Sequence, residues 1–255
     1  TPVDRLVYNA RKEAALKTEL EEIMLTFVSN VSHELRTPLT CIKGYAETLL
    51  EGALSEPDLA LRWMKVIYDE AGRLERLIRD LLDLSMIEAH QVEMHFNEVD
   101  LVALCKHTAA VLAPHGKNRG VTIEVVADDN FPLWRADEDR ISQVITNLVD
   151  NAIKYSLADG VVTIKLSYNR EKAEIEVIDR GSGMPEEELP RIFERFYRVE
   201  KGSAARFGGR GLGLSIAMHI VEAHDGELRV ESKLHEGTRF RVSLPVGDVT
   251  WLEEE

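Results

Sequence analysis

The sequence is poor in the features that mark several common classes of protein. It has only two cysteines, Cys41 and Cys105, far apart and outside any CxxC motif, which argues against a disulfide framework or a cysteine zinc site and fits a reducing compartment. No apolar run approaches the roughly 18 residues of a membrane span, and no signal peptide is visible. Basic residues are outnumbered, 31 Lys and Arg against 45 Asp and Glu, so the net charge of −14 argues against a general nucleic-acid-binding protein.

The composition is otherwise that of a folded protein. Hydrophobic residues make up 44% of the chain and charged residues 30%, which is enough apolar material for a core. A length of 255 residues corresponds to one large domain or two smaller ones. The chain begins at Thr1, without Met and inside a helical pattern, so we expect a fragment of a longer protein.

The first 90 residues follow a helical period. Apolar side chains recur in steps of three and four from Leu16 to Leu49 and again from Leu59 to Leu84. Between them, residues 51–57 carry a glycine and, at the end, a proline, which predicts a break. Two helices joined by a short turn form an antiparallel hairpin. Because one hairpin cannot bury both stripes, we expect two copies to pair into a four-helix bundle, and therefore a homodimer.

After about residue 95 the pattern changes to short alternating segments separated by helical ones. Strands are predicted at residues 121–126, 162–168, 173–179, 227–232 and 238–244. Helices are predicted at residues 101–113, 138–155 and 212–224. This order predicts an α+β sandwich, in which helices cover one face of a mixed sheet.

One histidine stands out in the first helix. His33 points away from the apolar stripe, within a segment, residues 32–38, that we expect to interrupt the helix, and it is flanked within one turn by Glu34 and Thr37. Pro38 removes a backbone donor and predicts a kink. A histidine on a helix surface is usually a solvated side chain, and this cluster alone does not decide otherwise. A neutral imidazole is, however, a nucleophile.

Further motifs follow His33 in a fixed order. The segment HELRTP resembles the H box of the sensor histidine kinases of two-component systems, and four more boxes resemble the N, G1, F and G2 boxes at residues 147–156, 179–183, 192–198 and 209–214. A last glycine-rich turn follows at residues 236–238. The chain thus resembles that family, of the PhoR and WalK type, over about residues 20–245. The resemblance implies a HisKA-type dimerisation hairpin followed by a catalytic domain of the Bergerat (GHKL) ATPase type.

The phosphate-binding motifs of other nucleotide-binding folds are absent. There is no GxxxxGK[ST] sequence, and Leu214 stands where the dinucleotide-binding fingerprint needs its third glycine. The resemblance therefore implies that ATP and Mg²⁺ are bound in the Bergerat manner.

The N box supplies candidates for the cation and the phosphates. Asn147 and Asn151 are four residues apart on one helix face, and their amide oxygens can ligate a hard cation. The resemblance implies that Asn151 is the principal Mg²⁺ ligand, with Asn147 beside it, whereas the plain alternative is two surface asparagines. Lys154 and Tyr155 extend the same face by a turn, and Lys154 can reach a phosphate.

The G1 box supplies candidates for the base. Asp179 ends a predicted strand, and a carboxylate, which only accepts hydrogen bonds, can read the exocyclic amine of adenine. Gly181 and Gly183 allow a close approach of backbone and base, although an ordinary strand-ending turn has the same sequence. The resemblance adds Thr238, in the later glycine-rich turn, to the nucleotide-binding residues.

Residues 184–208 resemble a mobile lid. Phe193 and Phe196 would anchor it to the body, and Arg198 would meet the polyphosphate. After it, backbone N–H groups at the start of a helix can bind phosphate oxygens, at Gly209, Gly211, Leu212 and Gly213. Four positions depart from the usual residues of the family without removing a proposed catalytic group: Arg180, Ser182, Arg210 and Asp225.

From the resemblance we expect ATP-dependent phosphorylation of His33, followed by transfer to an aspartate of the receiver domain of a response regulator. Glu34 would hydrogen-bond the second ring nitrogen of His33, and Thr37 would position water for a phosphatase reaction on the partner. Thr40, Gly44 and Tyr45 are exposed candidates for partner choice. Two alternatives stay open: a Bergerat-type ATPase clamp in which His33 has no role, and a degenerate kinase that acts as a scaffold or phosphatase.

Four segments are expected along the chain. They are a coiled-coil signalling helix, a dimerisation and phosphotransfer domain, a catalytic ATP-binding domain and an acidic tail, at residues 1–22, 23–92, 98–247 and 248–255. We expect this portion to be cytoplasmic and the full-length protein to reach the membrane through a sensor region outside this sequence.

Overall fold

The computed structural model describes residues 2–52, 55–88, 93–199 and 211–246, with side chains described from Met24 onward. Two compact units divide the chain, one ending at Leu81 and the other beginning at Leu82. The division falls within the second helix.

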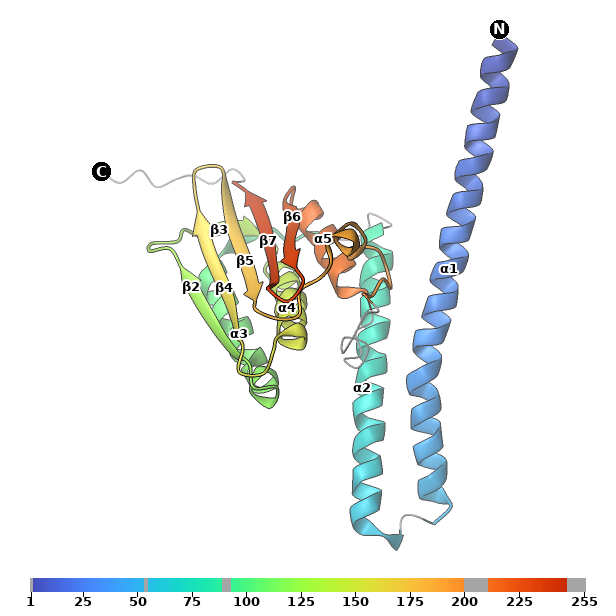
Figure 1. Cartoon of the computed structure of the whole chain (residues 1–255), viewed down its shortest axis with the longest axis vertical. Helices are drawn as coiled ribbons and strands as arrows, with labels where there is room; N and C mark the ends of the chain where they lie inside the picture. Colours follow the sequence, from blue (N-terminus) through green and yellow to red (C-terminus); the bar gives the residue numbers. More distant parts are fainter. Residues whose placement is uncertain (1, 53–54, 89–92, 200–210, 247–255) are drawn as a thin grey trace. The chain divides into compact units, whose positions relative to one another are not determined.

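The first unit is a helical hairpin, as the apolar spacing predicts (Figure 1). Helix α1 spans Pro2–Leu50 and helix α2 spans Pro57–Glu88. Gly52 takes φ +132° in the turn, and Pro57 is the first residue of α2, where its missing N–H has no helical partner to lose. The predicted break is therefore confirmed. The expected interruption at residues 32–38 is wrong, because α1 runs unbroken through Pro38.

The second unit contains a five-stranded mixed sheet. Its strands are β2 (Thr122–Ala127), β4 (Val161–Tyr168), β5 (Lys172–Asp179), β6 (Glu227–Lys233) and β7 (Gly237–Pro245), in the spatial order β2-β4-β5-β7-β6. The pair β2 and β4 is parallel, and the other pairs are antiparallel.

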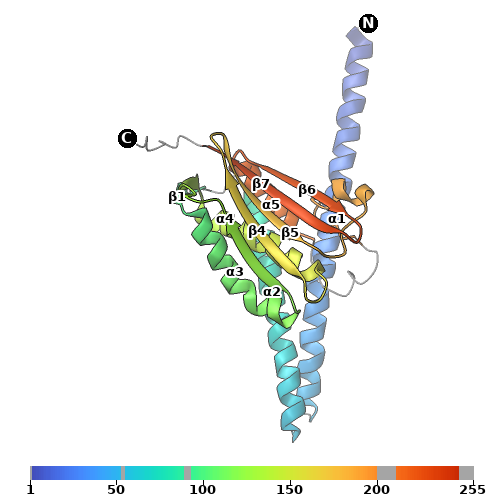
Figure 2. The same cartoon turned by 60° about the vertical axis from the view of Figure 1, so that its left-hand side comes forward.

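Three helices cover one face of this sheet (Figure 2). They are α3 (Leu101–Asn118), α4 (Glu138–Tyr155) and α5 (Gly213–Ala223). The predicted α+β sandwich is confirmed.

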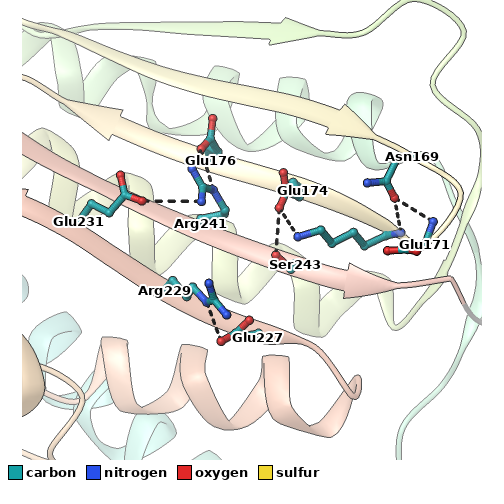
Figure 3. Close-up of polar contacts among 10 residues, drawn as sticks. Asn169, Glu171, Glu174, Glu176, Glu227, Arg229, Glu231, Arg241 and Ser243 are labelled. Atoms are coloured by element: carbon teal, nitrogen blue, oxygen red, sulfur yellow. Dashed lines mark hydrogen bonds and ion pairs between the residues drawn. The ribbon is translucent and has the colours of Figure 1, made fainter.

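The core lies between these helices and the inner face of the sheet. Alternate strand residues such as Ile164, Val177 and Val242 are almost fully buried, as the period of two predicts. The outer face is polar: Glu176 accepts hydrogen bonds from Arg241 at 2.8 and 2.9 Å across the strands β5 and β7 (Figure 3).

Two short strands and the end of one helix differ from the sequence-based expectation. Strand β1 (Asn97–Val99) pairs antiparallel with β3 (Trp134–Ala136), and neither is long enough to show an alternating pattern. Helix α3 continues through Pro114 to Asn118, whereas the expected end was residue 113. Its last turn is fixed by Gly116, which is buried and whose carbonyl accepts from the N–H groups of Arg119 and Val121.

Candidate functional site

Helix α4 carries the N-box residues at its C-terminal end. Asp137 caps the helix, with its carboxylate accepting the Arg140 N–H at 3.1 Å. The helix then buries one apolar face against the sheet, from Ile141 to Ile153. The asparagines project from the remaining, partly exposed face.

Asn147 connects the N box to the start of α5. Its side-chain nitrogen donates to the carbonyl oxygen of Gly213 at 3.1 Å, and a Cβ on Gly213 would stand 3.4 Å from Asn147 Cγ. The amide oxygen of Asn147 is not used in this bond. Asn151 is half-buried, and its side chain makes no hydrogen bond to the residues that the structure describes. Two amide oxygens are therefore available to a hard cation, which the chemistry of Mg²⁺ favours.

Asp179 is a buried hydrogen-bond acceptor at the end of β5. Its side chain accepts the Gly181 N–H at 2.8 Å, and the residue is only 5% exposed. Burial raises the pKa of Asp179 to about 6, and the backbone N–H groups of Gly181 and Thr238 oppose that shift. Thr238 lies directly opposite Asp179 on β7 and is itself buried, with its hydroxyl 2.9 Å from the Ser232 hydroxyl.

The glycines of this turn have a packing role. A Cβ on Gly181 would stand 2.1 Å from the Tyr155 carbonyl oxygen, and one on Gly183, which has φ +58°, would stand 1.9 Å from the carbonyl oxygen of Lys233. The turn is thus pressed against the backbone of two neighbouring segments, and the Ser182 N–H donates to the Tyr155 carbonyl oxygen at 3.1 Å. These backbone contacts alone require glycine at both positions, whether or not a ligand binds there.

Lys154 and Tyr155 stand beside charged neighbours. The Lys154 ammonium lies 3.6 Å from the Asp150 carboxylate. Burial raises the pKa of Tyr155, an effect that Arg198 opposes and Asp150 reinforces. The charge of Arg198 in the F box thus acts on Tyr155 in the N box.

The described part of the expected lid runs from Met184 to Val199. It contains a 3-10 helix, η2 (Glu186–Arg191), and its buried apolar residue is Ile192, whereas Phe193 is only half-buried. The expected anchoring by Phe193 is thus supplied largely by its neighbour.

Phe196 connects the F box to the glycine-rich G2 segment. Its N–H donates to the Gly211 carbonyl oxygen at 2.8 Å, and Gly211 has φ +70°. Leu212 is fully buried and immediately precedes α5, which begins at Gly213. Gly209 lies outside the described residues.

The histidine segment belongs to the hairpin unit. His33 is exposed, and the Thr37 hydroxyl donates to the His33 carbonyl oxygen at 3.2 Å. Glu34 contacts Arg73 of α2 at 3.9 Å rather than the His33 ring. Tyr45, expected to be exposed, is half-buried, with its ring centroid 6.0 Å from that of Trp63.

Sequence reasoning missed a pair of residues at the N box, Asp150 within it and His115 on α3. Asp150 binds both Lys154 and His115, the latter from α3. The four-residue interval between Asp150 and Lys154 indicates their ion pair from the sequence alone. The contact with His115 joins two helices and has no local signature.

Two family models match the chain. Residues 23–90 match the His Kinase A (phospho-acceptor) domain, and residues 136–248 match the histidine kinase-, DNA gyrase B-, and HSP90-like ATPase. The chain belongs to the sensor histidine kinases.

Curated relatives of this chain agree with that assignment. Sensor histidine kinase WalK of Bacillus subtilis is 34% identical over 244 residues, which are 94% of this chain and 39% of WalK. The chain thus spans about two fifths of the curated relative.

Among solved structures, histidine kinase ThkA in complex with response regulator protein TrrA matches with a TM-score of 0.70 and 26% identity, over 90% of this chain and 64% of ThkA. Full-length ShkA in complex with AMPPNP matches with a TM-score of 0.68 and 26% identity, over 89% of this chain and 47% of ShkA. Within the described residues of this chain, none of the helices has the length and hydropathy that a membrane span requires.

Proposed function

We propose that this chain is the catalytic portion of a sensor histidine kinase that phosphorylates its own His33 from ATP and passes the phosphoryl group to an aspartate of a response regulator. Two observations made together carry the proposal. The exposed imidazole of His33 lies in a phospho-acceptor hairpin, and the buried carboxylate of Asp179, a hydrogen-bond acceptor, lies in an ATPase-type domain.

Each end of the nucleotide has candidate partners. Asp179 would accept a hydrogen bond from the adenine amine, in a turn that Gly181 and Gly183 hold in place, with Thr238 opposite. The Asn147–Gly213 bond supports a phosphate site at the start of α5, where backbone N–H groups favour anions.

Mg²⁺, when bound through Asn151 and Asn147, would neutralise charge on the phosphates. Lys154 and Arg198 would add positive charge from the protein, and the electrostatic reach of Arg198 to Tyr155 supports its role. The function of these side chains is positioning and charge neutralisation, which is most of what phosphoryl transfer requires.

At the acceptor, a ring nitrogen of neutral His33 forms a bond to the γ-phosphorus while the bond from that phosphorus to ADP breaks. The imidazole then carries positive charge, which the carboxylate of Glu34 would stabilise on leaving Arg73. Thr37 would orient water for dephosphorylation of the partner.

A homodimer and a receiver-domain partner belong to the same proposal. The hairpin leaves large apolar side chains at 46–65% exposure, among them Leu39, Leu61, Met64 and Ile78. A second hairpin would cover them in a four-helix bundle. The complex of the relative ThkA with a response regulator supports the partner class.

The test is incubation of the dimeric chain with γ-labelled ATP and Mg²⁺. We expect stable label in base and loss in acid, as for a phosphorus–nitrogen bond, and no label in His33→Gln or Asn151→Ala. His107→Gln, at an exposed histidine of α3, is the matched control and should be labelled normally. Label that survives in His33→Gln, or ATP hydrolysis without any protein label, would refute the proposal and favour an ATPase clamp.

A further inference from the structure

The Lys154 side chain contacts the carboxylate of Asp150, a residue to which the sequence motifs assign no role. Asp150 Oδ2 is 3.6 Å from Lys154 Nζ, and Asp150 Oδ1 is 3.2 Å from His115 Nδ1 on α3. In addition, Arg119 Nη1 donates to the Lys154 carbonyl oxygen at 2.9 Å. Two of these polar contacts join the C-terminal ends of α3 and α4, and the third, between Asp150 and Lys154, lies within α4.

The Lys154 ammonium has little access to counter-ions in the solvent. Its side chain is only 16% exposed, while those of Asp150 and His115 are 36% and 45% exposed. A shielded ammonium is costly to bury without a charged partner, and such a partner also orders the side chain. Asp150, one turn back on the same helix, is that partner.

Asp150 also borders the rest of the N box. It directly precedes Asn151, and its charge acts on the neighbouring Tyr155. A carboxylate so close to a phosphate site would by itself repel the ligand, so its presence there calls for a compensating role.

Resting on the function proposed above, we propose that Asp150 is a positioning residue for the nucleotide phosphates. It holds the Lys154 ammonium where a phosphate of a nucleoside di- or triphosphate binds, and His115 holds the Asp150 carboxylate from α3. Both residues act through Lys154 and touch no nucleotide.

The direction in which one substitution changes the nucleotide affinity distinguishes positioning from repulsion. In Asp150→Asn, a negative charge near the phosphates disappears, so repulsion alone predicts tighter binding. Positioning predicts weaker binding, because the lysine loses the partner that orders it. A merely structural role predicts equal loss for ligands with and without phosphate.

The experiment is calorimetric titration of the whole chain with ADP and with adenosine, both in Mg²⁺. We expect Asp150→Asn to weaken ADP binding about tenfold, as for one lost charge-assisted contact, and to leave adenosine binding unchanged. His115→Ala should weaken ADP binding about threefold, as for a smaller, indirect effect of the same sign. The matched controls, His107→Ala on α3 and Asp139→Asn on α4, alter exposed residues of the same helices and should bind normally.

Two further variants keep the test sharp. Asp150→Glu retains the carboxylate and should retain most of the ADP affinity, which excludes a folding defect as the cause. Asp150→Asn combined with Lys154→Ala should bind ADP no more weakly than Lys154→Ala alone, since Asp150 acts through that lysine.

Tighter ADP binding in Asp150→Asn, a parallel loss of adenosine binding, or additive losses in the double variant would each overturn the positioning role. An unsubstituted chain that binds neither ligand would instead overturn the proposed function itself.

Discussion

Neutralising Asp179 should stabilise the empty protein while damaging its nucleotide site. The pKa of this carboxyl rises from 3.8 to about 6 because it is buried, so the folded protein holds its proton more tightly than the unfolded chain does. Stability from this group is fully present below about pH 4 and is lost as the pH rises through about 6. At pH 7.5 the folded protein carries the whole penalty of a buried charge.

The size of that penalty follows from the two pKa values. Their difference corresponds to about 3 kcal/mol, at about 1.4 kcal/mol for each tenfold change in proton affinity. Asp179→Asn removes the charge and keeps an oxygen for the Gly181 N–H. We therefore expect the variant to gain up to about 3 kcal/mol at pH 7.5, a rise in Tm on the order of 5–10 °C for a unit of this size.

The assay is thermal or urea unfolding of the nucleotide-free chain between pH 5 and 8. The stability gain of Asp179→Asn should shrink as the pH falls toward 5, because the wild-type carboxyl then becomes neutral. Asp129→Asn, at an exposed position, is the control and should change little at any pH. The variant should also bind ATP more weakly, since its amide N–H₂ would face the amine of adenine. A loss of stability at pH 7.5, or a gain that does not depend on pH, would refute the reasoning.

Three further substitutions test the packing of the two units. Gly183→Ala should destabilise the second unit and abolish ATP binding, because its Cβ would meet the Lys233 carbonyl oxygen and φ is positive; circular dichroism melting and a fluorescent ATP-analogue titration check this. Glu176→Gln should reduce stability by about 1–3 kcal/mol in urea unfolding, since it removes the charge that binds Arg241 on the outer face of the sheet. Leu77→Ala, at a residue 2% exposed in the hairpin, should cost about 2–5 kcal/mol, and an unchanged melting curve would contradict its place in that core.

Helix α4 shows how far local sequence signals reach. Its predicted limits, residues 138 and 155, match the structure because Asp137 caps one end and an apolar stripe with a period of three to four continues to the other. The strands β1 and β3 escaped prediction because three residues carry no alternating pattern. The predicted end of α3 at residue 113 is about one turn short, because the helix continues through Pro114 to Asn118, where Gly116 packs against the chain that follows.

For the site, the sequence placed residue types and spacing but not their partners. The four-residue interval of Asn147 and Asn151 was enough to put both on one helix face. That Asn147 donates to Gly213, and that Glu34 faces Arg73 rather than His33, depends on how separate helices and loops pack. The glycines of the G1 box looked like room for a ligand, and the structure shows that their own backbone neighbours already demand them.

The proline of α1 has a mechanical consequence. Pro38 has no N–H to give to the Glu34 carbonyl oxygen, and the preceding hydroxyl, that of Thr37, turns back to the His33 carbonyl oxygen. The helical turn that carries the His33 imidazole thus lacks one of the backbone hydrogen bonds that stiffen the rest of this 49-residue helix. A twisting or bending force applied along this helix will therefore deform it most at this turn, which is the one that carries the His33 ring.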